Sequence, residues 1–239
     1  MTTKAIEKMH TDSPVLGVDG ARGGWLVVIR RGERLAAQLL PSITEVLALP
    51  AAQIAVDMPL GLADAGQRAC DVAARRLLPP GRRSSVFAPP RRYMLGCDYA
   101  AANAAGRARE GVGLSRQAWH LSPRIAELDQ AVSPAAQARV AESHPELVFH
   151  RLNGWHALPR KTTAEGRQAR LALLDDAGLP DARPLLAQFP GRRAKPDDVL
   201  DAVACTLTAG RRLARTAACV PDTAVLPRDS RGLAMAIWY

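Results

Sequence analysis

Acidic residues recur in this sequence where regular elements are expected to end or begin. Asp19 closes the apolar run VLGVDG, and Asp57 follows the apolar run QIAV. Asp198 and Asp201 stand three residues apart in KPDDVLDAVACTLTAG, so they share one face of the helix predicted there. Clustered carboxylates repel one another unless a cation joins them, and Mg²⁺ or Mn²⁺ takes such oxygen ligands. The pattern therefore predicts a metal site able to support phosphodiester hydrolysis.

Two further acids, Glu142 and Glu146, lie where a strand is expected to give way to a helix in RVAESHPELVFHRL. Each can join the cluster as a catalytic residue, or each can be a surface acid or a helix-start dipole partner. Similar alternatives exist for Asp19 as a turn residue and for Asp198 as a first-turn charge. Neither alternative, a turn residue or a first-turn charge, suits Asp201, because it lies a turn inside an apolar helix, where an unpaired carboxylate costs free energy.

The elements that must position these acids alternate between strand and helix. Strands are predicted over 15–20 and 53–62, with a hairpin over 25–40 that turns at Gly32. Residues 139–152 are expected to begin as a strand and become a helix near Pro145. The remaining expectations are helices at 42–49, 67–78, 93–109, 115–131, 134–140, 163–177 and 196–215, a loop at 79–92, a linker at 181–193 and a final strand at 232–239. This order predicts an α/β protein with a mixed sheet, whose ligands gather outside the carboxyl ends of its strands.

Length and composition fit a globular protein that can bury a sizeable core. The chain has 239 residues, of which 48% are hydrophobic. We expect a flexible tail over 1–13 and one domain over 14–239, with a helical insertion at about 65–138. The four widely spaced cysteines form no zinc pattern, and no apolar run reaches membrane-spanning length, so we expect a cytoplasmic protein with no membrane partner.

Basic residues are in excess, with a formal net charge of +9, which favours phosphate-bearing partners such as nucleic acid. Candidate phosphate contacts occur in GRRSSVFAPPR and KTTAEGRQAR. They are Arg82, Arg83, Ser84, Ser85, Arg91, Lys161 and Arg170. The alternatives are a solvated, proline-rigid loop for the first segment and an ordinary capped helix for the second. Nearby His144 can be a general base or a structural hydrogen-bonding group.

Eight segments occur in an order that resembles a domain-of-unknown-function family described as predicted RNase H-like nucleases. They are VLGVDGARGGW, IAVDMPLGL, GRRSSVFAPPR, QAWHLSPRIAELD, ESHPELVF, KTTAEGRQAR, KPDDVLDAVACTLTA and GLAMAIW, and they run from about residue 15 to the end of the sequence. The resemblance implies an RNase H-like fold, a five-stranded mixed sheet flanked by helices, with its first three strands antiparallel and the helical insertion after the fourth.

The same resemblance implies a metal-dependent nuclease. The first-strand aspartate of such enzymes corresponds to Asp19 and the fourth-strand acid to Asp57. The DxxDA segment is similar to the metal-binding helix of Holliday-junction resolvases, which implies roles for Asp198 and Asp201. In the resolvases the fourth-strand acid is commonly Glu. Two alternatives stay open: a nucleotide-binding protein of the sugar-kinase and actin type, and a non-catalytic binding protein that kept the fold.

Overall fold

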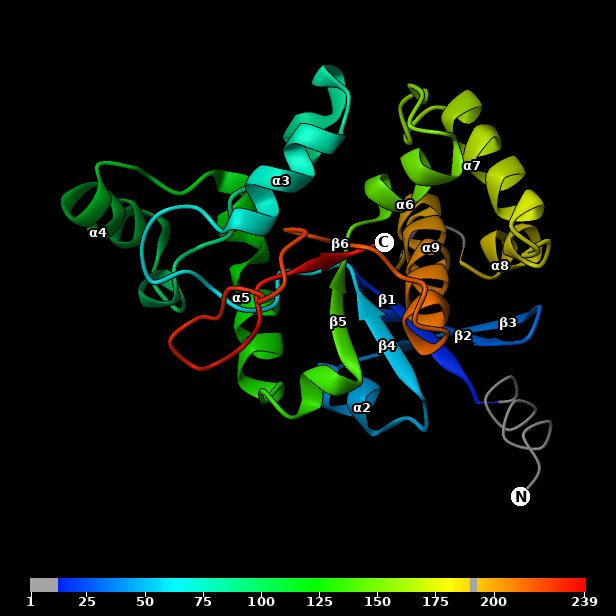
Figure 1. Ribbon diagram of the computed structural model, residues 1–239, viewed down its shortest axis with the longest axis horizontal. Helices are drawn as coiled ribbons and strands as arrows, with labels where there is room; N and C mark the ends of the chain where they lie inside the picture. The colour runs from blue at the N-terminus through cyan, green and yellow to red at the C-terminus, as the bar shows by residue number, and fades with distance from the viewer. Residues whose placement is uncertain (1–12, 190–192) are drawn as a thin grey trace.

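Seven strands form one mixed sheet among residues 13–189 and 193–239, the part of the chain that the computed structural model describes (Figure 1). The strands are β1 (Val15–Ala21), β2 (Gly24–Arg31), β3 (Arg34–Leu40), β4 (Gln53–Val56), β5 (Val140–Ser143), β6 (Cys219–Val220) and β7 (Ile237–Trp238). Their order in the sheet is β3-β2-β1-β4-β5-β7-β6. The first three pair antiparallel, β1, β4, β5 and β7 run parallel, and β6 returns antiparallel to β7. The predicted α/β class with a mixed sheet is confirmed.

The expected number of five strands is wrong, because the C-terminal segment adds two short strands beyond β5. The final strand expected over 232–239 is reduced to Ile237–Trp238, since residues before it turn back through a bridge between Arg228 and Ala234. β6 then pairs with β7 at the edge of the sheet. A strand of two residues carries no readable alternation, so the sequence pattern did not reveal β6.

Helices account for most of the remaining described residues. They are α2 (Ile43–Ala48), α3 (Ala69–Leu77), α4 (Tyr99–Glu110), α5 (Arg116–Ala131), α6 (Pro145–Leu152), α7 (Ala164–Asp176), α8 (Ala182–Gln188) and α9 (Pro196–Leu213), with 3₁₀ turns η1 (Pro80–Ser85), η2 (Arg92–Met94) and η3 (Ala136–Ala138). Ser42 and Thr163 cap α2 and α7 by accepting hydrogen bonds from backbone N–H groups. None of these helices is both long enough and apolar enough to cross a bilayer.

Several of the predicted elements differ in the structure. The helix expected over 134–140 is reduced to η3, and the strand expected over 53–62 ends at Val56. The linker expected over 181–193 contains α8, because Pro184 falls in the first turn, where a helix tolerates proline. The loop expected over 79–92 contains η1. The helix expected from residue 93 begins at Tyr99, where the Asp98 side chain caps it. The segment between β4 and β5 holds α3, α4 and α5, as Figure 1 shows. Of the tail expected over 1–13, all but Ser13 lies outside the described residues.

The two faces of the sheet are covered by different helices. Leu16 and Val18 of β1 pack with residues of α2 and α5 on one face. On the other face α9 lies along β1, β2 and β4, with α6 and α8 packed against it in turn (Figure 1). Because side chains alternate along a strand, the position between Leu16 and Val18, which is Gly17, faces α9.

Gly17 is the position at which β1 and α9 approach each other most tightly. A Cβ atom at Gly17 would lie against the carbonyl oxygen of Ala202 and 2.5 Å from the backbone N of Thr206. Neighbouring positions on this face are also small: Ala55 of β4 packs with Cys205 and Ala209 of α9. The absence of bulk on the strands therefore lets the backbone of α9 lie directly on the sheet.

We expect Gly17→Ala to lower the free energy of unfolding by about 3 kcal/mol or more, because backbone atoms of α9 have no rotamer with which to make room. Urea unfolding followed by circular dichroism measures the change. Gly81→Ala is the matched control, since nothing lies within 4 Å of a Cβ atom at that position. A Gly17→Ala protein as stable as this control would show that α9 does not approach β1 this closely.

Candidate metal centre

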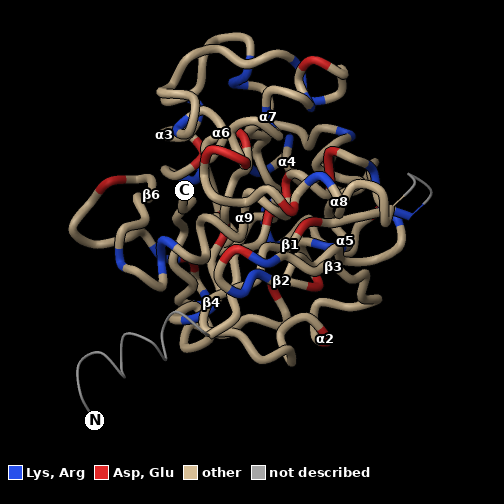
Figure 2. Tube along the Cα trace, turned by 90° about the vertical axis from the view of Figure 1, so that its right-hand side faces the viewer, with Lys and Arg blue, Asp and Glu red and all other residues tan. Residues whose placement is uncertain are grey.

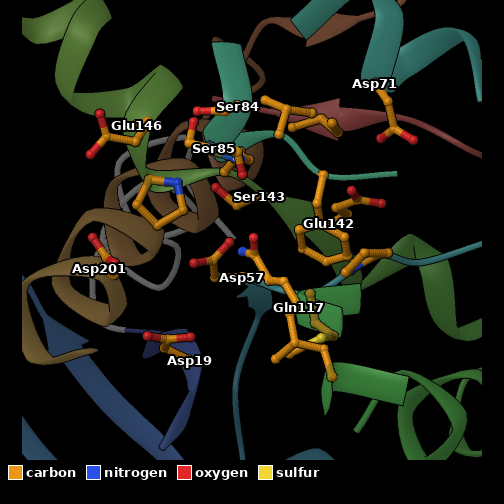
Figure 3. A pocket seen from close by; sticks show the side chains of 18 of the residues that line it. Asp19, Asp57, Asp71, Ser84, Ser85, Gln117, Glu142, Ser143, Glu146 and Asp201 are labelled. Atoms are coloured by element: carbon orange, nitrogen blue, oxygen red, sulfur yellow. The ribbon is translucent and has the colours of Figure 1, made fainter. Parts of the chain in front are cut away.

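Three aspartates from three separate elements meet at the carboxyl ends of β1 and β4. Asp19 lies two residues beyond Gly17, so it faces α9 as Gly17 does. Asp57 follows β4, and its backbone N–H donates to the carbonyl of Val18 at 2.8 Å, which holds it beside Asp19. Asp201 lies in the second turn of α9. One carboxylate oxygen from each of the three lies within 4.8 Å of the others, and Figure 3 shows the side chains converging.

Asp201 is the most deeply buried of the three, at 2% exposure. Its Oδ2 accepts a hydrogen bond from the ammonium group of Lys161, which lies between α6 and α7. Its Oδ1 is buried and has no hydrogen-bond partner among the described residues. A buried carboxylate oxygen without a partner is costly, so the site offers an open ligand position there.

The protein environment disfavours ionisation of all three carboxyl groups. Burial raises the pKa of Asp19 well above its usual range, and the charges of Asp57 and Asp201 add to this effect. Burial likewise raises the pKa of Asp57 to about 6, although Lys161 opposes the shift. For Asp201, burial raises the pKa to about 7, again against the opposing charge of Lys161. A bound cation would reverse these shifts by favouring the charged forms.

The donor set suits a hard divalent cation. Three carboxylates supply oxygen ligands only, which Mg²⁺, Mn²⁺ and Ca²⁺ prefer over the nitrogen and sulfur ligands typical of zinc sites. The unpartnered Oδ1 of Asp201 points to the same conclusion. The residues that the structure brings together can therefore hold a metal ion.

Asp198 is not in this cluster of three. Its carboxylate accepts a hydrogen bond from the backbone N–H of Lys195 at 2.8 Å and so helps to cap α9. Burial raises the pKa of Asp198, against that hydrogen bond. This is the first-turn role that the sequence offered as the alternative for Asp198.

Glu142 is also kept away from the cluster. The hydroxyl groups of its neighbour Ser143 and of Thr208 in α9 form a hydrogen bond of 2.8 Å, so Ser143 faces α9. Because side chains alternate along a strand, Glu142 points to the opposite face of the sheet. There both of its oxygens accept hydrogen bonds from the guanidinium of Arg68 at 2.7 Å. The pair is buried, and Glu142 also accepts a hydrogen bond from the backbone N–H of Leu60 at 2.8 Å.

Glu146 and His144 line the same cavity as the three aspartates. Arg170 donates to Oε1 of Glu146 at 2.6 Å, while Oε2 is buried without a hydrogen-bond partner among the described residues. Burial raises the pKa of Glu146, but the charge of Arg170 outweighs it and leaves the pKa below the usual range. Nε2 of His144 lies 3.3 Å from the carbonyl oxygen of Ser85. Its Nδ1 is buried and has no hydrogen-bond partner among the described residues.

The cavity has a volume of about 410 Å³ and receives only part of the predicted phosphate-binding set. Arg82, Ser84, Ser85 and Lys161 line it. Arg83 instead donates to the carbonyl of Leu78, and Arg91 is paired with Glu110 at 3.1 Å. Arg170 is 0% exposed and is occupied by Glu146 and by backbone carbonyls, so its expected role as a direct phosphate contact is wrong.

The sequence interpretation overlooked Arg68 and Asp71, which line the cavity with Glu142. Asp71 and Glu142 are labelled in Figure 3. Arg68 donates to Asp71 at 2.5 Å and to Glu142, forming a buried network of one cation and two carboxylates. The available signal was the three-residue spacing of Arg68 and Asp71 next to Cys70, at the start of a helix with an apolar face.

Replacing Asp57 with Asn should raise the stability of the metal-free protein at neutral pH. The pKa of Asp57, about 6, exceeds the unfolded value of about 4, so between them the folded protein holds a proton that the unfolded chain has lost. The wild type therefore loses stability relative to the variant as pH rises through this window. We expect a difference on the order of 1–3 kcal/mol at about pH 7.5 that vanishes at about pH 4.

Urea unfolding in the presence of a chelator, repeated across this pH range, measures that difference. Using the difference between two proteins cancels the opposite slope of His144, whose pKa burial lowers. A variant that is no more stable than the wild type at about pH 7.5 would show that burial does not disfavour ionisation of Asp57 in the folded protein.

Searches of curated proteins and of solved structures give no match for this chain. A family model matches residues 17–225, which include Asp19, Asp57 and Asp201 together with every element from β2 to β6. Because this match covers most of the sequence, the chain belongs to the family described as "Protein of unknown function (DUF429)".

Proposed function

We propose that the protein is an RNase H-like, divalent-metal-dependent nuclease that hydrolyses phosphodiester bonds in nucleic acid. The observation that carries this proposal is the convergence of Asp19, Asp57 and Asp201 within 4.8 Å in a cavity that also contains basic and hydroxyl side chains. The strand order β3-β2-β1-β4-β5, with its first three strands antiparallel, agrees with the core that the sequence resemblance implies. Mg²⁺ and Mn²⁺ are the ions that best suit the ligands.

The bound ion would supply Lewis acidity toward the phosphate and would lower the pKa of a water ligand. Asp19, Asp57 and Asp201 would hold it. Arg82, Ser84 and Ser85 line the cavity and would orient phosphate oxygens by hydrogen bonds.

Glu146 is suited to accept the proton of the attacking water. Its Oε2 has no hydrogen-bond partner in the described part of the chain, and its lowered pKa keeps it ionised at neutral pH. In the proposed step the water oxygen bonds to phosphorus as the bridging phosphorus–oxygen bond breaks. The water proton passes to Glu146, and the leaving oxygen takes a proton from solvent.

The net charge of +9 supports a polyanionic substrate. Figure 2 shows Lys and Arg positions spread over the trace, from the helices beyond the carboxyl ends of the strands to the strands themselves. The net positive charge, rather than a single basic patch, is what favours association with a polyanion, and it specifies no sequence.

Asp19→Asn and Asp201→Asn should each reduce cleavage of labelled nucleic acid by roughly 100-fold or more, because each removes a charge that holds the ion. Both should also weaken the rise in melting temperature that Mn²⁺ produces in the wild type. Single-stranded, hybrid and branched substrates are compared, and Asp197→Asn, altered on the same helix but outside the cluster, serves as the control.

The proposal fails if the wild type cleaves none of these substrates in either metal, or if both variants keep wild-type cleavage. Stabilisation by ATP, with no response to nucleic acid, would instead favour a nucleotide-binding protein.

A further inference from the structure

The ammonium group of Lys161 lies against one carboxylate of the proposed metal site. Its Nζ donates to Oδ2 of Asp201, and the side chain is 37% exposed while that of Asp201 is only 3% exposed. An unperturbed lysine is protonated at neutral pH, so this hydrogen bond sets an ammonium charge directly against the aspartate cluster.

Formal charge limits how many divalent ions can join this lysine. The three carboxylates of the cluster carry −3 when ionised. One divalent ion and one ammonium carry +2 and +1, so their sum of +3 balances the carboxylates. Two divalent ions beside the ammonium would carry +5 and leave an excess of +2 among partly buried groups. At such short separations in a poorly solvated site, an excess of this size is unfavourable.

The hydrogen-bonding of the carboxylates agrees with this count. Of the two Asp201 oxygens, Oδ2 is occupied by Lys161 and Oδ1 is buried and unpartnered among the described residues. Glu146, 5% exposed, also has an unpartnered oxygen lining the same cavity, which is a second sign that a ligand belongs there. Asp198, a fourth carboxylate on the same helix, is engaged in capping α9. A second ion would have to displace Lys161 to reach Oδ2 of Asp201.

We propose that the site binds a single divalent ion and that the ammonium group of Lys161 takes the place of a second one. This inference rests on the metal site of the proposed function but not on cleavage activity. The lysine supplies a cation that is fixed to the chain, so binding of the metal follows a single-site isotherm.

Titration of the purified full chain with Mn²⁺, followed by calorimetry and electron paramagnetic resonance, tests the proposal. The wild type should bind one Mn²⁺ per chain and show an uncoupled spectrum. Lys161→Met removes the charge at similar length, frees Oδ2 of Asp201, and should bind two Mn²⁺ whose spectrum is coupled, as expected for ions about 4 Å apart. Lys161→Arg keeps the charge and should bind one.

Lys195→Met is the matched control, because Lys195 is an exposed lysine at the start of the same helix and outside the cluster. It should bind one Mn²⁺.

Two coupled ions in the wild type would overturn the inference and show that metal displaces Lys161, without contradicting the proposed nuclease function. One ion in Lys161→Met would also overturn it. If that variant does not fold, the stoichiometries of the wild type and Lys161→Arg decide. One ion without any nuclease activity would support the inference and refute the proposed function.

Discussion

The direct contact between α9 and β1 is the constraint on which the rest of the site depends. Gly17 lets the helix backbone lie on the strand, and side-chain alternation then points Asp19 at the same helix. Parallel pairing of β1 with β4 sets Asp57 alongside, and Asp201 comes from the helix itself. The three carboxylates thus come from strand ends and a helix rather than from loops, which fixes their separation before any ion binds.

This arrangement places carboxyl groups whose ionisation is unfavourable inside a well-packed protein. The pKa of Asp57 and that of Asp201 are raised by burial, and Lys161 opposes the shift in both. The apolar remainder of α9 packs against the sheet and the helices around it, and this packing holds the acids in place. Sites that bind charged ligands commonly sacrifice stability in this way, because groups arranged for a ligand repel one another without it.

Several elements of the fold and the meeting of the three aspartates were predictable from the sequence, and the predictions that were wrong have physical causes. The hairpin over β2 and β3 and the change from β5 to α6 at Pro145 follow from local chemistry and are confirmed. The meeting of Asp19, Asp57 and Asp201 was predictable because each follows or interrupts an apolar run. The pairing of Arg68 with Glu142 was not, because it joins residues 74 positions apart and depends on which face of β5 the Glu142 side chain takes. Arg170 was misassigned because sequence does not show that a helical arginine is buried against Glu146.

The cavity around the aspartates takes its lining residues from two parts of the fold. Its floor comes from β1, β4 and α9, whereas Arg82, Ser84 and Ser85 belong to a segment inserted between β4 and β5. Arg68 begins that insertion and ties it to β5 through Glu142 on the face of the sheet opposite α9. Substitutions in the inserted segment, on the far side of the Arg68–Glu142 pair, can change that part of the cavity lining without disturbing the three aspartates. Sequence changes confined to this segment can therefore alter what the cavity binds while the aspartate cluster stays the same.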